Sequence, residues 1–162
     1  MKKFIIVLIV CLINFSCSTK YQARMWKGGY ESTQLGEDIY RVAFIGNGYT
    51  SSTKAQDYCL LRCAELTIQN GYKYFVIINE DNYSSNSTYR TPVTTNSNYN
   101  ISGNYTGYNV SGTTYSYGGQ TYNISKPTSK NTILMLKEKD SNNIVYEASF
   151  LINSLRSKYK MY

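Results

Sequence analysis

The residue types most often used for catalysis are sparse in this sequence. No histidine occurs among its 162 residues, which excludes Ser-His-Asp triads, Cys-His dyads and imidazole-ligated metal sites. Residues 51–54 read Ser-Ser-Thr-Lys and match the S-x-x-K pattern of penicillin-recognising enzymes, but the K-T-G and S-D-N motifs of those enzymes are missing. Acyl transfer by Ser51 and Lys54 is therefore the weakest hypothesis, and we expect neither enzyme activity nor a cofactor.

Cys59 and Cys63 are the two cysteines of the central part of the chain. Two thiols without histidine supply too few ligands for a metal site, so we expect no bound metal. A disulfide between positions four apart in a regular helix is geometrically awkward. The pattern therefore favours buried, free cysteines.

A glycine-rich segment precedes the first predicted helix and is a candidate anion-binding loop. Gly46, Asn47, Gly48 and Ser51 would offer backbone amides at a helix start, with Lys54 close by. The spacing of a P-loop is absent. The alternative, which the pattern favours, is a tight connection from strand to helix with a hydroxyl cap.

The N-terminus has the layout of a secretory signal. Two lysines are followed by an apolar run over residues 4–13, which is too short to span a bilayer as a helix. Ser16 before Cys17 resembles the lipobox of bacterial lipoproteins, whereas Cys11 follows Val10, a β-branched residue where a small one is needed. We predict a signal peptide at residues 1–16 and lipid attachment at Cys17; an ordinary cleavage site is the alternative.

The formal charge of the whole chain is +7, and the chain without its two N-terminal lysines keeps 15 basic against 10 acidic residues. An exported protein of this kind is not expected to bind nucleic acid. We interpret the charge as a mild preference for anionic surfaces such as lipid headgroups or wall polymers. The residue after Cys17 is Ser18 and not the aspartate that holds bacterial lipoproteins at the inner membrane, so the outer membrane is the expected location.

Apolar periodicity predicts an α+β fold with a small mixed or antiparallel sheet of about four strands. The order is β-β-α-β-insert-β-α, with two helices covering one face of the sheet. In the first helix, residues 53–70, apolar positions recur at intervals of four, four and three and form one buried face. The expected strands are residues 29–35, 39–45, 72–79 and 132–138, and the second helix is residues 147–160.

Composition divides the chain further. The lipidated cysteine and a polar tether are expected at residues 17–28, followed by a single α+β domain at 29–160. A low-complexity insert, residues 82–128, interrupts that domain; 38 of its 47 residues are Asn, Tyr, Ser, Thr or Gly. This tract is expected to lie outside the hydrophobic core.

The tract contains three imperfect copies of Y-N-[IV]-S-G, which begin at Tyr99, Tyr108 and Tyr122. The favoured interpretation is a disordered, solvated insert. The functional alternative is a contact surface, because tyrosine rings stack on sugars or pack in protein interfaces, and the alternating pattern also permits self-association. The candidate contact residues are Tyr99, Tyr105, Tyr108, Tyr115, Tyr117 and Tyr122.

Several segments of the chain together resemble a family of small bacterial lipoproteins with no assigned activity. They are GNGYTS at 46–51, AELT at 64–67, GYKYF at 71–75 and the insert rich in Tyr, Gly and Ser. The resemblance spans most of the chain from residue 29 onward. It implies a lipoprotein with this domain plan, and it supplies no catalytic residues.

The leading hypothesis is a cell-envelope lipoprotein with a non-enzymatic binding or structural role. It would be anchored to the membrane through Cys17 and would display its tyrosine-rich loop to wall glycan, surface polysaccharide or an envelope protein. The second hypothesis is an envelope-stress or assembly sensor that acts through its folded domain. Ser-Lys acyl transfer is the third.

Overall fold

The computed structural model describes residues 18–105, 107–140 and 144–161, so the predicted signal peptide and Cys17 lie outside the described residues. The chain forms two compact units, one of Met1–Ser85 with Ser125–Tyr162 and one of Asn86–Ile124. The first unit contains both described helices and the hydrophobic core. Neither of these helices is long and apolar enough to cross a membrane.

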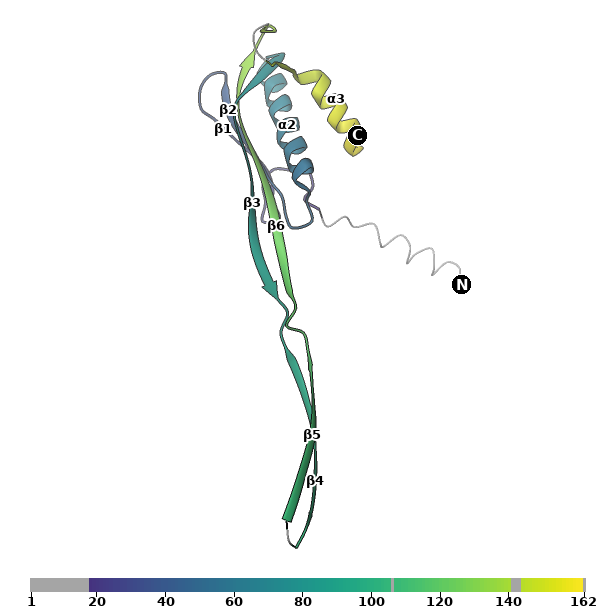
Figure 1. Cartoon of the computed structure of the whole chain (residues 1–162). Coiled ribbons are helices and arrows are strands. Elements are labelled where there is room, and N and C mark those ends of the chain that lie inside the picture. The colour runs from purple at the N-terminus through teal and green to yellow at the C-terminus, as the bar shows by residue number, and fades with distance from the viewer. Residues whose placement is uncertain (1–17, 106, 141–143, 162) are drawn as a thin grey trace, which may run out of the picture. The chain divides into compact units, whose positions relative to one another are not determined.

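The fold is α+β, as predicted: two helices pack against a mostly antiparallel five-stranded sheet, and a two-stranded hairpin is separate from it. The order of strands in the larger sheet is β1-β2-β6-β3-β7. The two helices, α2 and α3, lie side by side on one face of this sheet (Figure 1). The elements are β1 (Gly29–Gln34), β2 (Ile39–Ile45), α2 (Ser52–Gln69), β3 (Tyr74–Arg90), β6 (Thr121–Leu136), β7 (Tyr146–Glu147) and α3 (Ala148–Tyr159).

Ser51 and Gly71 determine where α2 begins and ends. The side-chain oxygen of Ser51 accepts a hydrogen bond from the backbone amide of Lys54 at 3.2 Å and caps the first turn. Gly71 has a φ of +80°, a backbone conformation that favours glycine, and the chain leaves the helix there. The bounds of α2 differ from the predicted 53–70 by one residue at each end.

The apolar face of α2 packs against the sheet and forms the core. Its predicted inward residues are all buried, which confirms the helical periodicity. Aromatic and aliphatic side chains from three strands cover that face, and α3 adds two buried residues. The helix residues are Ala55, Cys59, Cys63 and Leu66; the strand residues are Phe44, Phe75, Ile133 and Met135; and α3 contributes Ala148 and Leu155.

The described residues contain seven strands, where the sequence pattern predicts about four. The strand expected at 72–79 continues to Arg90 as β3, and the strand expected at 132–138 begins earlier, at Thr121, as β6. Two more strands lie wholly within the tract, so the disordered interpretation of residues 82–128 is wrong for most of its length. The tract is rich in Thr and Tyr and also contains Val and Ile, and these residues favour strands. They form these two strands although the described residues of the strands have no buried face.

The segment predicted as a polar tether is instead part of the first unit. Thr19 is only 3% exposed, and its backbone amide donates a hydrogen bond to Oγ1 of Thr50 at 3.1 Å. The ring of Tyr21 packs against Tyr30 and Tyr58 with centroid distances of 4.9 and 5.5 Å. The polar composition of this segment predicted that it would be solvated. The amide and hydroxyl of Thr19 instead form hydrogen bonds within the domain.

Cys59 and Cys63 are free and buried, as the sequence predicted. The thiol of Cys59 donates to the backbone oxygen of Val42 at 3.5 Å. Burial raises the pKa of the Cys63 thiol. Both side chains are fully buried, so both thiols are protected from thiol reagents in the folded protein.

The free, buried state of Cys59 and Cys63 can be tested with a thiol reagent. A form of the protein that begins at Ser18 has Cys59 and Cys63 as its only cysteines. A chromogenic thiol reagent should react slowly with this form when it is folded, and should titrate both thiols in denaturant without reductant. Denatured protein in which neither thiol reacts would contradict the free-cysteine assignment.

Candidate functional site

Two copies of the Y-N-[IV]-S-G repeat lie opposite each other in the second unit. β4 (Thr94–Asn104) contains one copy, β5 (Gly107–Tyr117) contains the other, and these strands pair as an antiparallel hairpin. The register places Tyr99 opposite Gly112. It likewise places Tyr108 opposite Gly103. Each copy is thus the cross-strand partner of the other, with the tyrosine of one facing the glycine of its partner.

The glycines of the repeat leave room for the tyrosine rings. A Cβ added to Gly103 would lie 2.3 Å from Cδ1 of Tyr108, and a Cβ added to Gly112 would lie 2.7 Å from Cδ1 of Tyr99. Each ring therefore lies over the glycine opposite, a close approach that a side chain would block. A Cβ added to Gly107 would meet nothing within 4 Å. The tyrosine of each copy therefore packs on the glycine of the other copy.

One face of the hairpin carries four exposed apolar or aromatic side chains, which we call the aromatic face: Tyr99, Ile101, Tyr108 and Val110. The two aliphatic residues are cross-strand partners and lie between the two tyrosines. Exposure of the four side chains runs from 62% for Val110 to 84% for Tyr108. The hairpin therefore presents an uncovered apolar strip with a ring near each end.

Polar side chains occupy the rest of the hairpin. Next to the aromatic face, Thr95 and Ser116 share a hydrogen bond at 3.3 Å, and Ser97 and Thr114 share one at 3.1 Å. Side chains alternate between the two faces of a strand, so the opposite face combines amides with two more tyrosines. We call that surface the amide face; it includes Asn96, Asn98, Asn100, Tyr115 and Tyr117.

The structure does not bring the six tyrosines predicted as contacts together as one cluster. Four of them lie on the two faces of the hairpin. Tyr105 lies in the turn between β4 and β5 and is exposed. Tyr122 lies in β6, and its hydroxyl donates to Oε1 of Gln120 at 2.7 Å. Arg90 is the only charged residue of Asn86–Ile124, so this unit offers a partner a single charged side chain.

The candidate anion-binding loop uses its backbone amides within the protein. The amide of Gly46 donates to the backbone oxygen of Pro127 at 2.8 Å, and that of Asn47 donates to Oγ1 of Thr19 at 2.9 Å. The amide of Thr50 donates to the backbone oxygen of Asn47 at 3.0 Å. Gly48 lies at the exposed end of the loop. This arrangement favours the alternative, a tight connection between β2 and α2.

Ser51 and Lys54 also have structural partners. Ser51 caps α2 as described above. The ammonium of Lys54 donates to Oγ of Ser18 at 3.0 Å and lies 5.4 Å from the ring centroid of Tyr58. The ammonium of Lys54 is therefore in contact with the N-terminal segment and with Tyr58.

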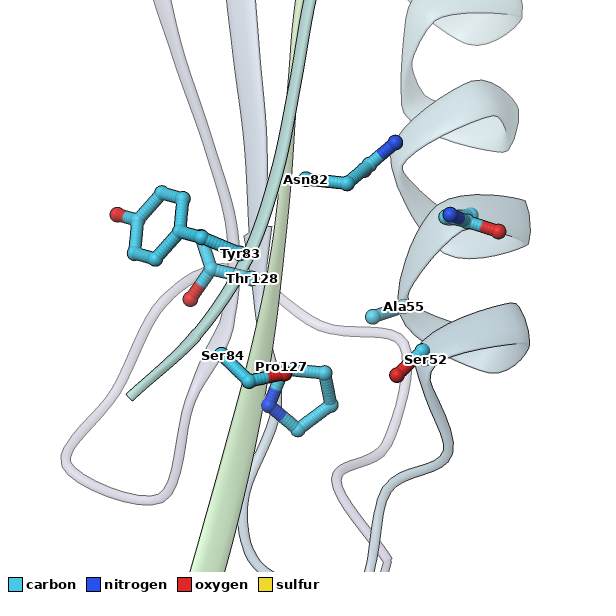
Figure 2. Close-up of a pocket in the computed structure, with 8 residues that line it drawn as sticks. Ser52, Ala55, Asn82, Tyr83, Ser84, Pro127 and Thr128 are labelled. Carbon is cyan, nitrogen blue, oxygen red and sulfur yellow. The ribbon is translucent and has the colours of Figure 1, made fainter. Parts of the chain in front are cut away.

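Figure 2 shows a small pocket between the start of α2 and the strands β3 and β6. Its volume is about 150 Å³, which is below the 300–1,000 Å³ or so of most small-molecule sites. The side chain of Asn82 points toward the helix, whereas the ring of Tyr83 lies on the other side of the strand (Figure 2). The lining is neutral, and we assign it no ligand.

Two carboxylates on α2, those of Glu65 and Asp57, link α2 to α3, and that of Glu65 also binds the N-terminal segment. Glu65 accepts a hydrogen bond from the hydroxyl of Tyr21 at 2.5 Å and one from Arg156 at 2.8 Å. Asp57 accepts from Lys158 and from the hydroxyl of Tyr159, both at 2.6 Å. Burial and the bond to Glu65 raise the pKa of Tyr21, and burial and the bond to Asp57 raise that of Tyr159.

These carboxylates are structural. Arg62 also lies 3.6 Å from Glu65, and both side chains are largely buried between the helices and the N-terminal segment. Among the described residues no group of three or more acidic or cysteine side chains is placed to hold a metal ion.

Comparison with known proteins gives no match: no protein-family model, no curated protein and no solved structure matches this chain. The resemblance to small bacterial lipoproteins therefore stays a prediction from the quoted segments.

Ring currents test the pairing of the two repeats. In the NMR spectrum of the protein, the α-protons of Gly103 and Gly112 should be shifted upfield because a tyrosine ring lies over each glycine. Tyr99→Leu should remove the shift at Gly112 alone, and Tyr108→Leu should remove it at Gly103 alone, so each variant controls for the other. Ordinary glycine shifts in the unaltered protein would contradict this register.

Proposed function

We propose that this protein is a lipid-anchored component of the bacterial cell envelope that binds envelope polysaccharide through the aromatic face and catalyses no reaction. The observation that carries the binding role is the aromatic face itself. Four exposed apolar or aromatic side chains are held next to one another on a hairpin that buries none of them. The anchor is Cys17, in the sequence context of a lipobox.

The physical chemistry of the aromatic face supports a binding role. A two-stranded hairpin gains little stability in water from side chains that it leaves exposed, so these residues are available to a partner. Each ring is placed over a glycine of the opposite strand. Rings held in this way lose less conformational entropy when a partner binds.

The chemistry around the rings favours a sugar as the partner. Flat tyrosine rings stack on the apolar faces of sugar rings, and the neighbouring serine and threonine hydroxyls can bond to sugar hydroxyls. Only one charged residue occurs in Asn86–Ile124, which disfavours strongly ionic partners. A neutral polysaccharide of the wall or the cell surface fits both properties.

The anchor is tested by replacing the cysteine. In cells, Cys17→Ala should abolish the acyl mass on the N-terminal peptide and should release the protein from the membrane fraction. Cys11→Ala is the matched control and should retain both the acyl mass and the membrane location. Acylated, membrane-bound Cys17→Ala protein would refute the anchor.

Binding is tested by changing one face of the hairpin at a time. Tyr99→Ser with Tyr108→Ser should weaken binding to isolated envelope polysaccharide by about tenfold or more, because each stacked ring contributes roughly 1 kcal/mol. The melting temperature should not change, because both side chains are exposed and lie outside the hydrophobic core of the first unit. Sedimentation with the polysaccharide measures binding.

The amide face provides the control. Tyr115→Ser with Tyr117→Ser removes two exposed tyrosines from the same hairpin and should leave binding nearly unchanged. Equal losses in the two double variants would argue against a role for the aromatic face. Binding that survives digestion of the polysaccharide and is carried by an envelope protein would contradict the choice of a sugar.

A further inference from the structure

Thr19 connects the N-terminal end of the described chain to two surface loops. Its hydroxyl donates to the backbone oxygen of Lys27 at 3.1 Å and accepts from the backbone amide of Asn47 at 2.9 Å. Its own amide donates to the side chain of Thr50 at 3.1 Å. The turn around Lys27 and the loop that holds Asn47 and Thr50 are therefore both fixed next to residue 19.

Each of these two loops presents a large exposed aromatic side chain. Trp26, the only tryptophan of the chain, is 85% exposed, and Tyr49 is 76% exposed. Met25 beside the tryptophan is also exposed. The turn is closed by reciprocal backbone hydrogen bonds between Met25 and Gly28, so the tryptophan is held on a tight turn. The described residues of the first unit leave all three side chains largely exposed.

Lysines lie close to the same N-terminal segment. The ammonium of Lys27 lies 4.5 Å from the centroid of the Trp26 ring. Ser18 lies at the edge of a groove of about 650 Å³ that is also lined by Lys20, Lys54 and Lys160. Glu65, the acidic residue of that groove, is already bonded to Tyr21 and Arg156. The groove therefore has an excess of positive charge.

Chain length sets the distance of this region from a membrane. Two residues of chain span at most about 7 Å, and the headgroup layer of a leaflet is about 5–7 Å deep. A lipid attached at Cys17 therefore brings Thr19, and the two loops bonded to it, to the headgroup layer. Thr19 is buried and bonded to Thr50, so the chain after Cys17 provides no long spacer.

We propose that the surface formed by Trp26, Tyr49, Lys20 and Lys27 docks on a phospholipid bilayer with anionic headgroups, with the two aromatic side chains in the interface. The proposal rests on the anchor proposed above and adds a second attachment to it. Tryptophan and tyrosine prefer the membrane–water interface, and lysines near the surface are attracted by anionic lipids. The lipid holds the chain only at residue 17, so this surface would fix the orientation of the domain against the membrane.

The single tryptophan is the probe. The full lipidated protein is placed in phosphatidylglycerol-containing vesicles, and mass spectrometry first confirms the acyl chain on Cys17. The emission of Trp26 should shift to the blue relative to denatured protein. Quenching by acrylamide should fall several-fold, and lipids brominated near the headgroup should quench the emission.

Moving the tryptophan provides the controls. In a Trp26→Phe background, Tyr49→Trp should report the same blue shift. Phe150→Trp in that background should keep the emission of a water-exposed tryptophan, because Phe150 is exposed near the start of α3, at the other end of that helix from Tyr159 in the groove.

The outcomes separate the two proposals. Protein that is acylated and floats with the vesicles, but whose Trp26 emission stays that of a water-exposed indole, overturns the docking surface and leaves the anchor intact. A blue shift of equal size for tryptophan at position 150 also overturns it, because the contact would not be specific to this surface. Absence of the acyl chain from Cys17 overturns the anchor and the docking together.

Discussion

Burial of one face of α2 against the sheet is the constraint on which the rest of the structure depends. Phe44, Leu61 and Phe75 are fully buried in the first unit, and burial of a side chain of this size contributes about 1.5–3 kcal/mol relative to exposure. The described side chains of the hairpin are exposed and add no comparable core. Because stability comes from the first unit, the second is free to leave its aromatic face uncovered.

Tyrosine has different physical roles in the two units of the described chain. In the first unit, the ring of Tyr58 packs edge-on against Phe44 and Tyr159, with centroid distances of 5.0 and 4.9 Å. The hydroxyl of Tyr21 reaches a carboxylate that also joins the helices. In the hairpin, rings lie over glycines and their hydroxyls stay in water. One amphipathic side chain thus closes a small core and also forms a candidate contact surface.

Local periodicity predicted the elements that have one buried face. The strand predicted over residues 39–45 has the observed bounds of β2, and the bounds of α2 differ from the prediction by one residue. Both predictions depend on local sequence: the regular spacing of apolar residues and, for the helix, the caps at Ser51 and Gly71. β3 and β6 extend beyond their predicted bounds, because their outer parts are exposed and carry no apolar alternation. The six candidate tyrosines could be named from the repeat, but not their grouping into faces.

The sequence by itself determined the α+β class, the buried helix face with its free cysteines and the existence of a tyrosine-rich repeat, because each follows from residues close together in the chain. Only the tertiary structure decided what those residues touch. The pairing of Tyr99 with Gly112 depends on a strand register, and the docking of Thr19 depends on Thr50, 31 residues away. Contacts between residues far apart in the chain produce no periodic pattern in the sequence. The segment at residues 17–28 was therefore predicted to be a tether, although its hydrogen bonds hold it to the domain.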